Sequence, residues 1–345
     1  MRNRKGYIVF WFFVLIVQVQ LLAQENFFSH YFMAASAFNP ALTGDTRFAR
    51  FQLVERIQPT VSHEMMTNTL VSYDQKLINH RSGFGISINQ RSARYREWET
   101  RFNYSYTLML FKRFWAKAGL GVSLHNINTR LHSYTFPDQY DNYGLIPGAQ
   151  TGEMIDGEKI YYAGVSAGLA AYTESMWLSL SVNELNRPRV SLFDEDYRAP
   201  LRIDATWGWL IPFDKNKRPR RIFAPNGGLK PYSSAGPIAT FHKNGPFHSL
   251  SFGINAFTNP VFWGLSYRYN AVFDSWLREG AASLHFLAGY RTETFCIGYS
   301  YDFMLNRTPT NFKGAHEISL VWYLYSVKAD YKINKPFPFP NQLMY

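Results

Sequence analysis

The sequence lacks the features that would support disulfide chemistry or a helical membrane protein. It contains one cysteine, Cys296, among 345 residues, which excludes an intramolecular disulfide and a cysteine-based metal site. Beyond the N-terminus no apolar run approaches the roughly 20 residues that a membrane-spanning helix needs. The mean hydropathy is −0.24, so we do not expect membrane helices in the body of the chain.

Aromatic side chains, in contrast, are abundant. They make up 18% of the residues, with 23 Tyr and 29 Phe, which is high for a soluble globular protein. An aromatic-rich chain that is polar on average fits a membrane β-barrel, in which half of each strand faces water. Composition alone fits a large soluble β-sandwich equally well.

The charge balance is basic, with a formal net charge of +11. Such a surface suits anionic lipid headgroups or acidic partners as well as nucleic acid. The basic residues are mostly scattered and match no nucleic-acid-binding motif, so we expect no nucleic-acid partner.

The N-terminus resembles an export signal. Residues 1–23 begin with basic residues, continue with the apolar run Tyr7–Val17 and end in "VQVQLLA", as a secretory signal does. We predict cleavage after Ala23. The alternative is a single membrane anchor, which the short run and its interruption by Gln18 and Gln20 disfavour.

Period-two alternation predicts an all-β chain. Segments of about ten residues alternate apolar and small or polar side chains between turn residues. The predicted strands are 47–57, 65–76, 83–92, 98–110, 115–126, 160–171, 175–183, 201–213, 234–242, 248–257, 261–270, 281–290, 293–303 and 316–327. About fourteen strands of this length predict a transmembrane antiparallel β-barrel over residues 47–327.

Connection lengths agree with a barrel that has short periplasmic turns and long outer loops. If the first hairpin loop is extracellular, the long connections 127–159 and 184–200 are extracellular too. One connection on the opposite side, 214–233, breaks the rule because it is long and basic. Its cluster, a possible periplasmic docking surface or simply a solvated turn, comprises Lys215, Lys217, Arg218, Arg220 and Arg221. Residues 328–345 are rich in proline and phenylalanine and predict a C-terminal tail.

Motifs for catalysis are missing. No histidine forms an HxxxH or HExxH pair, and no glycine string has the context of a nucleotide-binding loop. A barrel hydrolase would need a Ser or Asp/His cluster at one rim, and the sequence points to none. We therefore predict no catalytic, metal-binding or cofactor-binding residue and a protein that is not an enzyme.

Three stretches together resemble a known family. They are "FFSHYFMAASAFNPALTGDTRF" (27–48), "FWGLSYRYN" (262–270) and "IGYSYDFMLN" (297–306) followed by "GAHEISLVW" (314–322). In this order they resemble the PorP/SprF family of Bacteroidota outer-membrane proteins. The residues that carry the resemblance, with structural or partner-binding roles, are Asn39, Pro40, Gly44, Trp263, Gly264, Tyr267, Arg268, Tyr301, Asp302, His316 and Glu317.

The resemblance implies a non-enzymatic outer-membrane barrel of the type IX secretion system. Its implied partners are outer-membrane lipid, secretion-machine subunits and large exported cargo such as adhesins, with a possible part in gliding motility. Two features of the chain depart from the family pattern and bear on which partner it binds. The chain ends in a Pro/Phe tail without cysteine, and its second strand reads "VSYDQKL" (71–77). The alternative function is a passive porin or hydrophobic-solute channel.

Two placements follow from these motifs. Asn39-Pro40 favours a turn, and Gly44 permits a backbone conformation that other residues resist. We expect residues 24–46 to fold into the lumen or across the periplasmic mouth; a plain extended lead-in is the alternative. Asp302 is expected to face a wet lumen and to form a polar cluster with His316 and Glu317.

Overall fold

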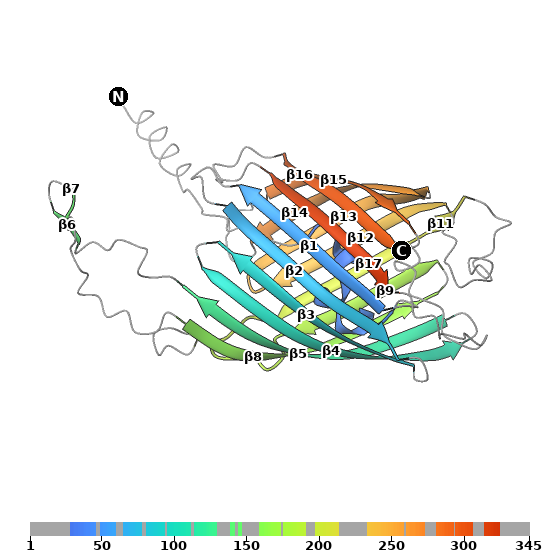
Figure 1. Cartoon of the computed structure of the whole chain (residues 1–345), viewed down its shortest axis with the longest axis horizontal. Coiled ribbons are helices and arrows are strands. Elements are labelled where there is room, and N and C mark those ends of the chain that lie inside the picture. The colour runs from blue at the N-terminus through green and yellow to red at the C-terminus, as the bar shows by residue number, and fades with distance from the viewer. Residues whose placement is uncertain are drawn as a thin grey trace, which may run out of the picture.

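The computed structural model shows a closed antiparallel β-barrel (Figure 1). It describes residues 28–45, 49–59, 65–77, 81–93, 95–111, 114–129, 139–141, 144–146, 159–173, 175–190, 197–213, 233–258, 260–272, 281–292, 294–305 and 314–324. The long strands are β1 Ala49–Pro59, β2 Met65–Lys76, β3 Ser82–Ser92, β4 Arg96–Phe111, β5 Phe114–Asn128, β8 Lys159–Tyr172, β9 Met176–Asn183, β10 Arg202–Trp209, β12 Ser234–Asn244, β13 Phe247–Thr258, β14 Val261–Val272, β15 Ala281–Arg291, β16 Phe295–Met304 and β17 Ala315–Leu324.

Each long strand pairs with its neighbours in sequence, and two pairings complete the ring. β1 pairs with β17 along nine residues, from Ala49–Leu324 to Ile57–His316. β10 pairs with β12, and the short β11, Ile211–Pro212, continues the line of β10 against β12 in the same register. The described chain therefore confirms the predicted barrel of fourteen strands. A separate hairpin, β6 Tyr140–Asp141 and β7 Gly144–Leu145, lies outside it.

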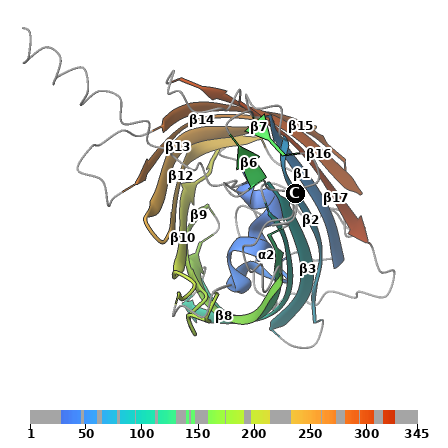
Figure 2. The same ribbon diagram turned by 90° about the vertical axis from the view of Figure 1, so that its left-hand side faces the viewer.

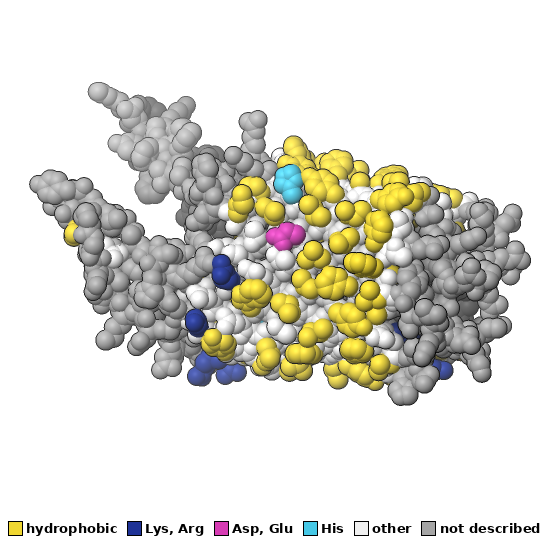
Figure 3. Space-filling model, viewed as in Figure 1, with side chains coloured by type: hydrophobic (Ala, Val, Ile, Leu, Met, Phe, Trp, Pro, Cys, Tyr) yellow, Lys and Arg dark blue, Asp and Glu magenta, His cyan; other side chains and the backbone are white. Residues whose placement is uncertain are grey.

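The alternation of side chains explains why these segments are strands of a barrel. In β16, Phe295, Ile297 and Tyr299 face outward, whereas Cys296 and Ser300 face inward and are buried. Successive side chains of a strand point to opposite faces. Hydrophobic side chains cover much of the outer surface in Figure 3, as lipid contact requires. No helix among the described residues is long and apolar enough to cross a bilayer.

The two ends of the barrel differ. One end of the barrel, on the left of Figure 1, holds the strand ends that are joined by residues 60–64, 129–158, 184–201 and 305–314. The strand ends joined by short turns such as 112–113 and 292–294 lie at the other end, as do those joined by the long connection 213–233. Long loops mark the outer side of such barrels, and we refer to the left end as the outer end.

The interior of the barrel is occupied by the chain itself. Residues 28–45, here called the lumen segment, form η1 Tyr31–Ala34, α2 Ala35–Phe38 and η2 Pro40–Leu42. Figure 2, a view turned by 90°, shows these short helices inside the ring of strands. The predicted signal (1–23) and tail (328–345) lie outside the described residues, and so does the basic cluster at 215–221.

Candidate functional site: a segment folded into the barrel lumen

The lumen segment runs lengthwise through the barrel. Its start, Ser29 and His30, contacts Glu317 near the outer end of β17. Its end, at Thr43 and Gly44, contacts Gly83 where β3 begins at the inner end. The aromatic and aliphatic side chains between form a buried core with the barrel wall: Phe32 is 1% exposed and meets the Phe262 ring at 6.5 Å between centroids. The barrel therefore has a hydrophobic core on its inside.

The start of the segment is held by one carboxylate. Glu317 accepts hydrogen bonds from two consecutive backbone amides, Ser29 N–H at 2.6 Å and His30 N–H at 2.8 Å. The His30 Nδ1 lies 2.6 Å from the Ser319 hydroxyl. His30 therefore takes part in this anchor through hydrogen bonds of both its backbone and its imidazole.

Buried charges around this start are balanced. Arg56 Nη2 lies 2.5 Å from Asp302 Oδ2, and its Nη1 lies 3.4 Å from Glu317 and donates to the Ser29 hydroxyl at 2.9 Å. His285 Nδ1 lies 2.5 Å from the other oxygen of Asp302. Arg268 approaches Asp302 at 4.0 Å. Two arginines and two carboxylates thus neutralise each other, as buried charge requires.

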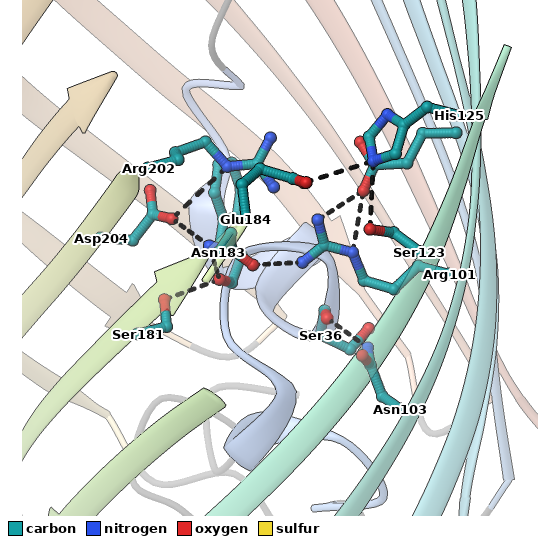
Figure 4. A network of polar contacts seen from close by, with 12 residues as sticks. Ser36, Arg101, Asn103, Ser123, His125, Ser181, Asn183, Glu184, Arg202 and Asp204 are labelled. Carbon is teal, nitrogen blue, oxygen red and sulfur yellow. Dashed lines mark hydrogen bonds and ion pairs between the residues drawn. The ribbon is translucent and has the colours of Figure 1, made fainter. Parts of the chain in front are cut away.

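A second polar network holds the middle of the segment (Figure 4). Asn103 donates to the Ser36 carbonyl and Ser181 to the Phe38 carbonyl, each at 2.8 Å. Asn183 links Phe38 to Arg101, which donates to the Asn183 side chain at 2.6 Å. These bonds satisfy carbonyls at the end of α2 that have no helical partner.

The same network contains a group of potential metal ligands. Glu97, Glu99 and His125 offer ligand atoms within 4.8 Å of one another. Arg91 lies 2.7 Å from Glu99 and 3.4 Å from Glu97, and Arg101 also donates to Glu99. The arginines supply the positive charge that a metal ion would bring, so the group is accounted for by ion pairs.

A notch of two glycines receives the Asn39-Pro40-Ala41 turn. Gly119 on β5 and Gly168 on β8 lie directly opposite each other. A Cβ atom at Gly119 would overlap the backbone of Pro40 and Ala41, and one at Gly168 would overlap the Asn39 side chain. Only glycine, which has no Cβ atom, leaves space for the turn at these two positions. The turn therefore packs directly against the backbone of β5 and β8.

Asn39 also ties two strands together. Its Oδ1 accepts from the Ala41 N–H at 2.9 Å and caps η2. Its Nδ2 donates to the Leu169 carbonyl of β8 at 3.3 Å and the Leu180 carbonyl of β9 at 3.2 Å. β8 and β9 pair through only six residues of each strand, so the segment reinforces a short ladder of the wall.

The end of the segment is again held by charge and backbone contacts. Gly44, with φ +59°, donates its N–H to Asp74 at 2.7 Å, and Asp74 is bound by Arg50 at 2.8 Å. Lys117 lies 2.7 Å from Asp45. The positive φ explains why glycine suits position 44.

The residues singled out in the sequence divide between two faces. Asn39, Pro40 and Gly44 belong to the lumen segment, and Gly264, Arg268, Asp302 and Glu317 face the lumen, whereas Trp263, Tyr267, Tyr301 and His316 lie on the outer face. The expected cluster of Asp302, His316 and Glu317 is therefore wrong for His316, whose neighbours are Tyr299 and Tyr301. Asp302 faces the lumen, but it is 2% exposed and is surrounded by protein groups instead of water.

The sequence analysis missed several residues that hold the segment. Ser29, Arg56 and His285 complete the charge cluster, and the Gly119–Gly168 pair forms the notch. Arg56 carried a signal, because it is a charged residue at an inward position of an alternating strand. The contacts of Ser29 carried none, since its partner Glu317 is 288 residues away.

The fold and its interior define a class before any comparison: a transmembrane β-barrel of fourteen strands whose lumen is filled by its own N-terminal segment. The family described as "Type IX secretion system membrane protein PorP/SprF" matches residues 21–322. The chain belongs to this family, and with its barrel fold it is a protein of the outer membrane. The resemblance seen in the sequence is thereby confirmed.

Solved outer-membrane proteins show distant similarity. Omp33 of Acinetobacter baumannii is 10% identical, with 82% of this chain and 100% of that chain covered and a TM-score of 0.42. A FadL homologue of Pseudomonas aeruginosa is 10% identical, with 84% and 94% covered and a TM-score of 0.42. BamA of Haemophilus ducreyi lacking POTRA domains 1–3 is 8% identical, with 79% and 70% covered and a TM-score of 0.40. No curated protein matches the sequence.

Proposed function

We propose that this chain is a closed, non-enzymatic barrel that assists the type IX secretion system in exporting large cargo proteins or anchoring them at the cell surface. Adhesins are the cargo we favour, with gliding motility as one process that would depend on them. The proposal rests on family membership and on the filled lumen, which leaves the barrel to act through its surfaces and loops.

The lumen segment is the observation that favours this function over a passive channel. A porin needs a water-filled passage, whereas here apolar side chains such as Met33 and Phe32 are 0% and 1% exposed inside the wall. The segment is also fixed along its length by buried ion pairs, backbone hydrogen bonds and the glycine notch. A hydrophobic-solute channel would also need the space that the lumen segment occupies.

Parts of the chain outside the described residues complete the proposal. Residues 1–23 act as the export signal, and the basic cluster at 215–221 docks a partner on the periplasmic side. Replacing Lys217, Arg218 and Arg220 by glutamate would reverse that charge. The expected result is loss of the partner without loss of the barrel from the outer membrane, measured by co-purification and by membrane fractionation.

The function is tested by affinity purification of the tagged protein from native outer membranes in mild detergent, with mass spectrometry of the proteins recovered. Recovery of secretion-machine subunits or of one large exported cargo protein at a fixed ratio supports the proposal. Recovery of the barrel alone, together with ion conduction in a planar bilayer, would instead assign it as a channel. A matched tag on an unrelated outer-membrane barrel controls for non-specific recovery.

A further inference from the structure

The lipid-facing wall has an unusual pair of side chains on β1 and β17. Outward positions of these strands are mainly apolar, as at Leu53, Ile318 and Trp322, which are 37%, 54% and 56% exposed. Glu55 on β1 and His316 on β17 also point outward. In Figure 3 one acidic and one histidine side chain lie near each other among hydrophobic side chains, at similar positions along the long axis.

Glu55 is a charged residue among apolar neighbours on the outer face. It stands between the outward residues Leu53 and Ile57 along β1, and it is directly opposite Ile318 on β17. Within the described part of the chain its carboxylate has no hydrogen bond or ion pair. A charge on the lipid face of a barrel destabilises it to an extent that grows with depth, so a partner that pairs with this carboxylate would stabilise the barrel.

His316 is held in a fixed orientation beside it. The Tyr299 hydroxyl lies 2.8 Å from His316 Nδ1, and the Tyr301 ring packs against the imidazole with 4.8 Å between centroids. With Nδ1 engaged, Nε2 is the ring nitrogen left for a further hydrogen bond. The register places Glu55 opposite Ile318 and Ile57 opposite His316, so the acid and the imidazole occupy diagonal corners of a four-residue patch.

We propose that this patch, Glu55, Ile57, His316 and Ile318, is the contact between two copies of this chain. Copies in one membrane with the same orientation are related by a two-fold axis along the membrane normal, which brings groups of equal depth together. A two-fold interface is self-complementary: Glu55 of each copy meets His316 of its partner. A second copy thereby supplies a partner to both groups at once, whereas another protein would have to match both independently.

The proposal is tested with a cysteine within the patch. Ile318→Cys lies between the two polar groups and close to the axis, so it faces its own counterpart. Leu178→Cys on β9, with the residue 55% exposed against 54% for Ile318, is the matched control on another part of the wall. Wild-type protein, whose lone Cys296 is buried, is the blank. Oxidation in native outer membranes should give a disulfide-linked dimer with Ile318→Cys alone.

Charge variants then test the pairing. Glu55→Leu or His316→Leu should each lower the dimer yield of Ile318→Cys about tenfold, the effect of losing ~1.4 kcal/mol of association. The exchanged pair, Glu55→His with His316→Glu, should restore it, because each copy again offers an acid and a base. Resistance of the folded barrel to SDS before heating shows that each variant has folded.

Three results would overturn the proposal: equal cross-linking of Ile318→Cys and Leu178→Cys, unchanged dimer yield in both leucine variants, or failure of the exchanged pair to recover. A cross-link from Ile318→Cys to a different protein would reassign the patch to that partner. The experiment is read from the barrel alone, so its result is independent of the proposed role in secretion.

Discussion

The two anchor points of the lumen segment are held by different forces. At the start, Glu317 and Asp302 bind Ser29, His30 and Arg56 through buried charge. In the second half, the Asn39 turn fits a notch whose wall is backbone at Gly119 and Gly168. The charge cluster should be sensitive to the loss of a charged partner and insensitive to a small change of shape. The glycine notch should be sensitive to an added atom and insensitive to a change of charge nearby. Substitutions at each anchor should therefore show which force holds it.

One reporter measures both anchors. Ala34 lies between them in η1 and is 0% exposed, so a cysteine there, in a Cys296→Ala background, reacts with a water-soluble maleimide only when the segment opens. The labelling rate follows the population of the open state when opening is fast. Each prediction below is a change in that rate relative to the reporter alone.

The largest effect is expected from Glu317→Ala. It removes the acceptor of two backbone amides and leaves Arg56 with fewer partners, and breaking a buried charge pair costs about 3–5 kcal/mol. Labelling at position 34 should therefore accelerate more than 100-fold. Glu317→Gln, which retains one carbonyl acceptor, should show a smaller increase. An unchanged rate in the alanine variant would show that this cluster does not hold the segment.

The next effect is expected from Gly119→Ala. The added methyl group overlaps the backbone of Pro40 and Ala41, which cannot turn aside as a side chain can, and overpacking costs about 1–3 kcal/mol. Gly264→Ala on the inner face of β14 is the control, because its nearest contact is the end of the Asn255 side chain. Equal labelling rates in the two variants would argue against a shape-specific notch.

A smaller effect is expected from Asn39→Ala, which removes the cap of η2 and the link between β8 and β9. Loss of a cap costs about 0.5–2 kcal/mol. Asn39→Asp retains the acceptor for Ala41 N–H but turns a carboxylate toward the carbonyls of Leu169 and Leu180. The aspartate variant should therefore label faster than the alanine variant; the reverse order would mean that the cap alone matters.

The smallest effect is expected on the outer face. His316→Leu alters the residue next to Glu317 in sequence, but its side chain points to lipid. Surface changes of this kind usually stay within about 0.5 kcal/mol, so labelling at position 34 should be nearly unchanged. A rate comparable to that of Glu317→Ala would mean that the two faces of β17 are coupled.

The barrel could be predicted from the sequence because lipid and lumen impose a period of two on every strand. The strand β2, at 65–76, was predicted without error, whereas β1 was placed two residues early at 47–57. The same alternation argues against the predicted cluster, since consecutive residues such as His316 and Glu317 must point to opposite faces.

The interior was harder to predict. Polar inward residues fit a wet lumen and a lumen of paired charges equally well, and the choice depends on residues 28–45. The Asn39-Pro40 turn has a local signature, but the glycines that receive it lie on β5 and β8, and no local pattern connects them. Contacts across nearly the whole chain, such as Ser29 with Glu317, arise only when the barrel closes.

The central claim, that residues 28–45 close the lumen, is tested most directly by single-channel recording from the purified full-length protein in a planar bilayer, beside its Glu317→Ala variant. The account predicts no steady ion conductance for the wild-type protein and openings in the variant, where the start of the segment is released. A steady conductance of the wild-type barrel would contradict it.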